Sequence, residues 1–163
     1  MYGWQEEAKD RVKRYADSRG IQLTDWLGQG FDGVVVRTNV KTALKALAFE
    51  PLYQKERDVY LRLREHQVQE IMGFSVPVMF AFDDDLWVIE MEVVTPPYVL
   101  DFAGAYLDRR PDFPDDVMEE WQADKLEQFG EERWSVVRSL MAHFARMGIH
   151  LADVKPGNVT FAD

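Results

Sequence analysis

The stretch that decides the fold is residues 148–161, which read GIHLADVKPGNVTF. Inside it, Asp153, Lys155 and Asn158 follow one another closely after a predicted amphipathic helix. Phosphoryl transfer needs a group that accepts or orients the nucleophile's proton, a cation near the moving phosphate and a ligand for Mg²⁺. These three side chains suit those roles in that order. A polar turn is the alternative, because Lys-Pro-Gly-Asn is also good turn chemistry.

A glycine-rich segment nearer the N-terminus, residues 28–35 (GQGFDGVV), points to the same chemistry. The GxGxxG pattern is shared by two nucleotide-binding folds and by ordinary turns. In a dinucleotide-binding fold a helix follows the glycines. Here β-branched residues at 34–36, a polar reversal and an apolar run at 42–47 predict strand, turn and strand. The pattern favours a glycine-rich hairpin that folds over phosphates, and a plain glycine hairpin is the alternative.

One lysine lies in the middle of the second predicted strand. The neighbours of Lys45 are apolar, so we expect its ammonium group to be partly buried and to need a partner. The next predicted helix, residues 51–65, carries an apolar stripe at helical spacing, and Glu56 falls within that stripe. We therefore predict a Lys45–Glu56 ion pair. An exposed glutamate on a loosely packed helix is the alternative.

The other predicted elements follow from periodicity and from turn residues. We expect helices over residues 4–18, 114–129 and 131–147, and an antiparallel hairpin formed by residues 74–82 and 86–94. The first helix is expected to dock on the main fold and to carry no chemistry. All five tryptophans are expected to lie in the core.

The composition describes one soluble domain. Its 163 residues are 47% hydrophobic, which is enough apolar material for a core. The net charge of −10 argues against nucleic acid as the main partner. No segment approaches the roughly 20 apolar residues of a membrane helix. The absence of cysteine and of a signal peptide indicates a cytoplasmic protein.

Taken in order, these features resemble the protein kinase-like family, from about residue 23 to the C-terminus. The resemblance implies an α+β fold, with a five-stranded antiparallel sheet and a helix in the N-terminal lobe and a truncated helical C-terminal lobe. The two lobes would span residues 20–94 and 95–163, and residues 1–19 would be a helical extension. It also implies that ATP and Mg²⁺ are the cofactors.

The resemblance assigns a role to each matching residue. Asp153 would be the catalytic base, with Lys155 beside the phosphate, and Asn158 would bind Mg²⁺. Asp163 lies too close to Asn158 to match the family's metal-binding aspartate by position, and it would be a stand-in for that ligand. The lysine two residues after the aspartate is more similar to Ser/Thr protein kinases than to small-molecule kinases. The glycine loop, the lysine strand, the helix and the hinge would hold the nucleotide through Gly28, Gly30, Gly33, Val35, Ala43, Lys45, Glu56, Met91, Glu92 and Val93.

The chain also departs from the family's pattern. Leu151 and Ala152 stand where the family has His-Arg, and the sequence ends at Asp163, before the Asp-Phe-Gly motif that supplies the principal Mg²⁺ ligand. Two functions therefore stay open. One is a minimal phosphotransferase that moves the γ-phosphate of ATP to an unknown hydroxyl acceptor. The other is an inactive pseudokinase that regulates or scaffolds a protein partner, with a homodimer as one form of association. As a third alternative, the sequence is a piece of a longer kinase.

Overall fold

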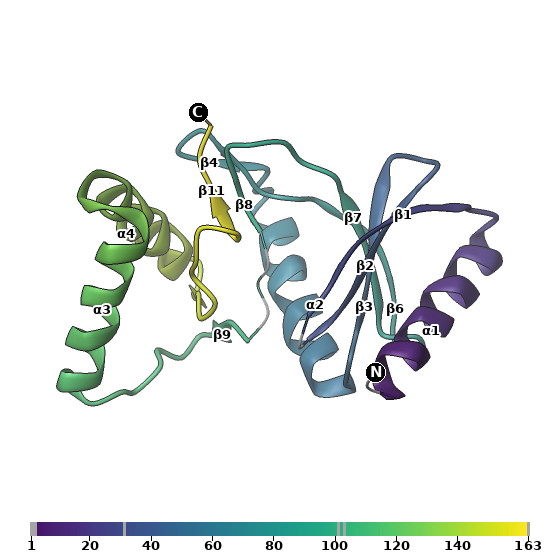
Figure 1. Cartoon of the computed structure of the whole chain (residues 1–163), viewed down its shortest axis with the longest axis horizontal. Helices are drawn as coiled ribbons and strands as arrows, with labels where there is room; N and C mark the ends of the chain where they lie inside the picture. Colours follow the sequence, from purple (N-terminus) through teal and green to yellow (C-terminus); the bar gives the residue numbers. More distant parts are fainter. Residues whose placement is uncertain (1–2, 31, 101, 103, 163) are drawn as a thin grey trace. The chain divides into compact units, whose positions relative to one another are not determined.

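The computed structural model describes residues 3–30, 32–100, 102 and 104–162, which form two compact units (Figure 1). The first unit comprises Met1–Gln67 and Pro77–Val94, and the second comprises Val68–Val76 and Thr95–Asp163. Helices and largely antiparallel sheets together confirm the predicted α+β class. Within the described ranges, no helix is both long enough and apolar enough to cross a membrane.

The first unit is built on a five-stranded antiparallel sheet with the strand order β1-β2-β3-β7-β6. Its strands are β1 (Leu23–Gln29), β2 (Gly33–Thr38), β3 (Thr42–Leu47), β6 (Met79–Asp83) and β7 (Val88–Glu92). The central strand β3 is buried along its whole length, whereas the edge strand β1 is mostly exposed. The glycine-rich segment thus forms a strand-turn-strand hairpin, as predicted, with β2 and β3 following the glycines.

Helix α1 (Gly3–Arg19) packs on one face of this sheet (Figure 1). Its apolar stripe contacts alternate residues of three strands, and the cluster comprises Ala8, Val12, Tyr15, Ala16, Val34, Val36, Leu44, Ala46 and Val88. The expected docking helix is confirmed. It ends before Gly20, whose φ of +66° is a left-handed conformation that glycine adopts readily.

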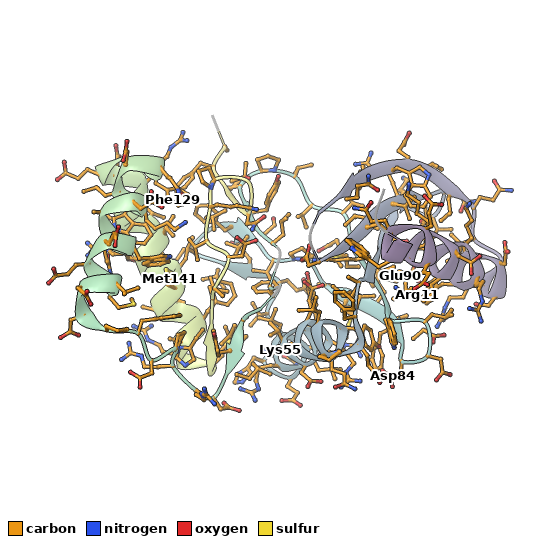
Figure 2. All side chains as sticks on the ribbon, turned by 60° about the horizontal axis from the view of Figure 1, so that its bottom comes forward. Arg11, Lys55, Asp84, Glu90, Phe129 and Met141 are labelled. Atoms are coloured by element: carbon orange, nitrogen blue, oxygen red, sulfur yellow. The ribbon has the colours of Figure 1, made fainter. Side chains whose placement is uncertain are left out.

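A buried hydrogen-bond chain ties α1 to the sheet. The hydroxyl groups of Tyr15 and Thr42 each donate to one carboxylate oxygen of Glu90, both at 2.8 Å. The hydroxyl of Thr38 lies 2.8 Å from that of Thr42. Burial and the bond to Glu90 raise the pKa of Tyr15, so its hydroxyl remains a donor. Arg11, labelled with Glu90 in Figure 2, adds bonds to two backbone carbonyl groups at 2.7 and 2.8 Å.

Helix α2 (Glu50–Glu65) contacts β3 and β6. Pro51 lies in its first turn, where a missing N–H costs little. Its buried residues are Tyr53, Glu56, Val59, Tyr60 and Leu63. Because the residues of β3 alternate between the two faces of the sheet, α2 can contact those that α1 does not cover.

The second unit contains helices α3 (Asp115–Phe129) and α4 (Glu131–Arg146), which pack against each other. Helix α4 buries Trp134, Val137, Leu140 and Phe144 at helical spacing. Short strands complete the unit. They are β4 (Glu70–Ile71), β5 (Phe74–Ser75), β8 (Tyr98–Val99) and β11 (Val159–Thr160) in one sheet, and β9 (Tyr106–Leu107) with β10 (Ile149–His150) in another.

Two sequence predictions were wrong. The single strand predicted over residues 74–82 is two strands, β5 and β6, which belong to different sheets. Pro77 lies between them, and a proline has no N–H with which to continue a strand ladder. Of the five tryptophans, all within the described ranges, Trp134 alone is buried. Trp26 is 46% exposed because it lies on the edge strand β1.

Candidate functional site

The predicted Lys45–Glu56 ion pair is present in the first unit. The Nζ atom of Lys45 donates to Oε1 of Glu56 at 2.8 Å. The Glu56 side chain is 1% exposed and that of Lys45 is 8% exposed. Moving either charge out of water alone would be costly, and a short hydrogen-bonded pair offsets that cost. The ammonium group of Lys45, in the middle of β3, is therefore held in a fixed position by a carboxylate of α2.

The sheet register places four of the predicted nucleotide-binding residues on one face. Val35 pairs with Lys45, and Ala43 pairs with Met91. Residues directly opposite each other on neighbouring strands project from the same face. These four alternate along their strands with the residues that pack on α1, so they belong to the face that carries α2.

The predicted hinge lies at the end of β7. Met91 and Glu92 are the last two residues of the strand, and Val93 follows them. The hydroxyl of Tyr60 lies 3.6 Å from the sulfur of Met91 and donates to it. The backbone N–H of Glu92 donates to the carbonyl of Val78 at 2.9 Å. This N–H is therefore already used within the unit.

The three glycines of the hairpin differ in how much space a side chain would have at each position. A Cβ atom on Gly33 would lie 2.5 Å from the carbonyl oxygen of Ala46, so the close approach of β2 to β3 requires glycine there. A Cβ atom on Gly28 would meet nothing within 4 Å, and one on Gly30 would meet only Asp32 Oδ1, at 3.5 Å. Packing explains Gly33 but neither of the other two. Their open side fits the approach of a phosphate to the backbone.

Sequence reasoning missed one charged residue of this site. Oδ2 of Asp32 lies 3.3 Å from Nζ of Lys45, and the Asp32 side chain is 28% exposed. Lys45 thus contacts two carboxylates, one from the hairpin and one from α2. The only sequence signal was an acidic residue between glycines that were expected to approach phosphates.

A second polar cluster holds α2 to the turn between β6 and β7, where Asp84 is labelled in Figure 2. The hydroxyl of Tyr53 donates to Oδ1 of Asp84 at 2.7 Å, and Arg57 lies 2.9 Å from the same oxygen. The hydrogen bonds from Tyr53 and Arg57 lower the pKa of Asp84. Burial, followed by the bond to Asp84, raises the pKa of Tyr53. The cluster fixes the helix that carries Glu56.

The predicted catalytic residues come together in the second unit. The side-chain N–H₂ of Asn158 donates to the backbone carbonyl of Asp153 at 2.9 Å and to its Oδ2 at 3.0 Å. Nζ of Lys155 lies 3.6 Å from the same carboxylate oxygen. Asn158 is buried, whereas the side chains of Asp153 and Lys155 are 42% and 54% exposed. Asn158 therefore orients Asp153, and its amide oxygen takes part in neither bond.

The donor set would suit a Mg²⁺ ion whose remaining ligands come from outside the protein. Across residues 3–30, 32–100, 102 and 104–162, no three His, Cys, Asp or Glu side chains form a metal-binding cluster. Mg²⁺ commonly takes one or two protein oxygens and completes its shell with phosphate and water. The amide oxygen of Asn158 suits that arrangement. Asp163, the other predicted metal ligand, lies outside the described residues.

Comparisons with known proteins give little further information. No known protein family matches the sequence, and no curated protein matches it. Among solved structures, the chain is similar to one in a ternary complex of streptomycin, ATP and APH(2")-IIa, with 10% sequence identity and a TM-score of 0.42. The similarity covers 74% of this chain and 36% of that chain, so it extends over little more than a third of that protein.

Proposed function

We propose that this chain is an ATP-binding, kinase-like phosphotransferase that moves the γ-phosphate of ATP to an unidentified hydroxyl acceptor. The observation that carries the proposal is the buried 2.8 Å pair between Lys45 and Glu56. A lysine inside a sheet, held by a carboxylate from a helix, is a fixed point charge suited to the α- and β-phosphates. In this proposal the first unit binds the nucleotide and the second carries the catalytic loop.

The hairpin and its sheet supply the nucleotide contacts. The backbones of Gly28 and Gly30 would lie against the phosphates, since the space beside Gly28 is open and the Asp32 carboxylate alone borders the Cβ position of Gly30. Val35 and Ala43 share the face of Lys45, so they would form the apolar surface under the base. The segment that begins at Met91 would contact the adenine edge.

In the catalytic loop, Asp153 would accept the proton of the attacking hydroxyl. Its Oδ2 already takes a hydrogen bond from Asn158 and lies near Lys155, so Oδ1 is the oxygen for that proton. Lys155 would offset negative charge at the transferred group, and Asn158 would hold Mg²⁺ through its amide oxygen. Bound ATP with Mg²⁺ supplies the phosphoryl group, and these side chains contribute positioning and charge.

The test is calorimetric titration with ATP, with and without Mg²⁺, followed by a turnover assay. Lys45→Ala should abolish saturable binding, whereas Lys55→Ala, a change at an exposed lysine of α2 labelled in Figure 2, should not. Mg²⁺-dependent ATP turnover or autophosphorylation should disappear in Asp153→Asn with binding retained. ATP turnover that persists in Asp153→Asn would contradict the role assigned to Asp153.

A pseudokinase is the second candidate function, with a protein partner or a homodimer. Exposed apolar side chains on and before α3 favour it, because Phe113, Val117 and Leu126 are 48%, 43% and 44% exposed. ATP binding without turnover, together with a mass in light scattering that exceeds one chain, would support this candidate. A monomer that turns over ATP would exclude it.

A further inference from the structure

We infer that Asp32 is a charge gate of the phosphate site, which holds Lys45 in the nucleotide-free protein and leaves it when a polyphosphate binds. The inference rests on the proposed function of Lys45 as a phosphate ligand. Asp32 lies in the hairpin between Gly30 and Gly33, and its backbone carbonyl accepts a hydrogen bond from the N–H of Ala48 at 2.7 Å. This bond fixes the hairpin close to β3, with the carboxylate of Asp32 3.3 Å from Nζ of Lys45.

The charges of the site explain why a gate is needed. Two carboxylates contact one ammonium group, so Asp32, Lys45 and Glu56 together carry a net charge of about −1 at neutral pH. A phosphate that approached Lys45 would meet the charge of Asp32 a few ångströms away, in a partly desolvated setting where repulsion is strong. Binding therefore requires that one carboxylate move away or that a cation accompany the phosphate.

Burial decides which carboxylate moves. The Glu56 side chain is 1% exposed and sits on a helix that the Tyr53–Asp84 bond fixes. The Asp32 side chain is 28% exposed and lies in the hairpin, so it can rotate into water at little desolvation cost. Asp32 is therefore the exchangeable partner of Lys45. Its effect should be largest for a polyphosphate without a metal ion and smaller for the Mg²⁺ complex.

The test measures binding of ATP and of inorganic tripolyphosphate to the full chain, each with and without Mg²⁺. Asp32→Asn keeps the shape of the side chain and removes its charge, and Asp25→Asn is the matched control on the exposed strand β1. Asp32→Asn should bind metal-free tripolyphosphate on the order of tenfold more tightly than wild type, the size of one modest charge interaction. Asp25→Asn should bind like wild type, and Lys45→Ala should bind neither ligand.

The outcomes separate the gate from the proposed function. If Asp32→Asn and Asp25→Asn bind alike while binding still needs Lys45, the gate is wrong and the nucleotide function stands. If Asp32→Asn gains affinity for tripolyphosphate but ATP binds no better than tripolyphosphate, the gate stands and ATP is the wrong ligand. Absence of binding in every variant overturns both. Asp32→Ala serves as a second variant, and urea denaturation without ligand verifies that each protein is folded.

Discussion

Replacing Gly33 with alanine should separate the glycine that the fold needs from the glycines that a ligand needs. The new Cβ atom would lie 2.5 Å from the carbonyl oxygen of Ala46 and 3.3 Å from the Cα atom of Leu47. Both are backbone atoms of β3, the central strand, which is buried throughout and paired on both sides. Neither can move aside as a flexible side chain would.

The clash sets the size of the expected effect. Overpacking in a well-packed region costs about 1–3 kcal/mol. We expect Gly33→Ala to lower the free energy of unfolding by about 3 kcal/mol, the upper end of that range, because the obstacle is backbone. Gly28→Ala meets nothing within 4 Å, and neither position has a positive φ. Gly28→Ala should therefore leave stability unchanged or raise it by about 0.4–1 kcal/mol, through the lost freedom of the unfolded chain.

Urea denaturation followed by tryptophan fluorescence measures both stabilities, and calorimetric titration measures ATP affinity in the same proteins. The expected pattern is reciprocal. Gly33→Ala loses stability, whereas Gly28→Ala keeps stability and loses affinity, because its methyl group would occupy the space assigned to a phosphate. Equal stability of the two variants would refute the packing argument. Unchanged ATP affinity in Gly28→Ala would refute the assignment of that space.

Three further predictions concern the polar contacts of the first unit. Tyr15→Phe removes a 2.8 Å bond to the buried Glu90 and should cost about 1.5–3 kcal/mol in urea denaturation, and a smaller loss would mean that Thr42 and water satisfy the carboxylate. The pKa of Asp84 is lowered in the folded protein from its ordinary value of 3.8. The contribution of Asp84 to the free energy of unfolding is therefore fully present above pH 3.8, and it is lost as the pH falls through the lower pKa of the folded state. Asp84→Asn should accordingly flatten the acid limb of thermal stability below about pH 5, and an unchanged limb would contradict this. Glu56→Ala removes the nearer carboxylate from the buried Lys45 ammonium group and should cost about 3 kcal/mol, the low end for breaking a buried pair because Asp32 stays 3.3 Å from Nζ, whereas Lys45→Met with Glu56→Leu should cost far less and still abolish ATP binding. Equal losses in these two proteins would show that the cost is packing rather than charge.

Several features of the site could be predicted from the sequence because they depend on short-range periodicity. Lys45 lies in an apolar strand and Glu56 in the apolar stripe of a helix, and two buried opposite charges on adjacent elements have a strong reason to pair. The pair forms at 2.8 Å as predicted. Asp153 and Asn158 are close in the chain, so a single turn suffices to bring them within hydrogen-bond distance. Helices α1, α2 and α4 were predicted for the same reason, since each buries one face of a regular repeat.

Only the tertiary structure decided which of these residues serve packing and which remain available to a ligand. The contact of Asp32 with Lys45 depends on the strand register of the hairpin, which sequence spacing does not set. The same register brings Gly33 against the backbone of β3 and leaves Gly28 open. The bond between Tyr15 and Glu90 joins residues 75 positions apart, and no local pattern specifies such a partner. Periodicity in the sequence predicts which face of a helix or strand a residue lies on. The packing of strands and helices determines which other residues it contacts there.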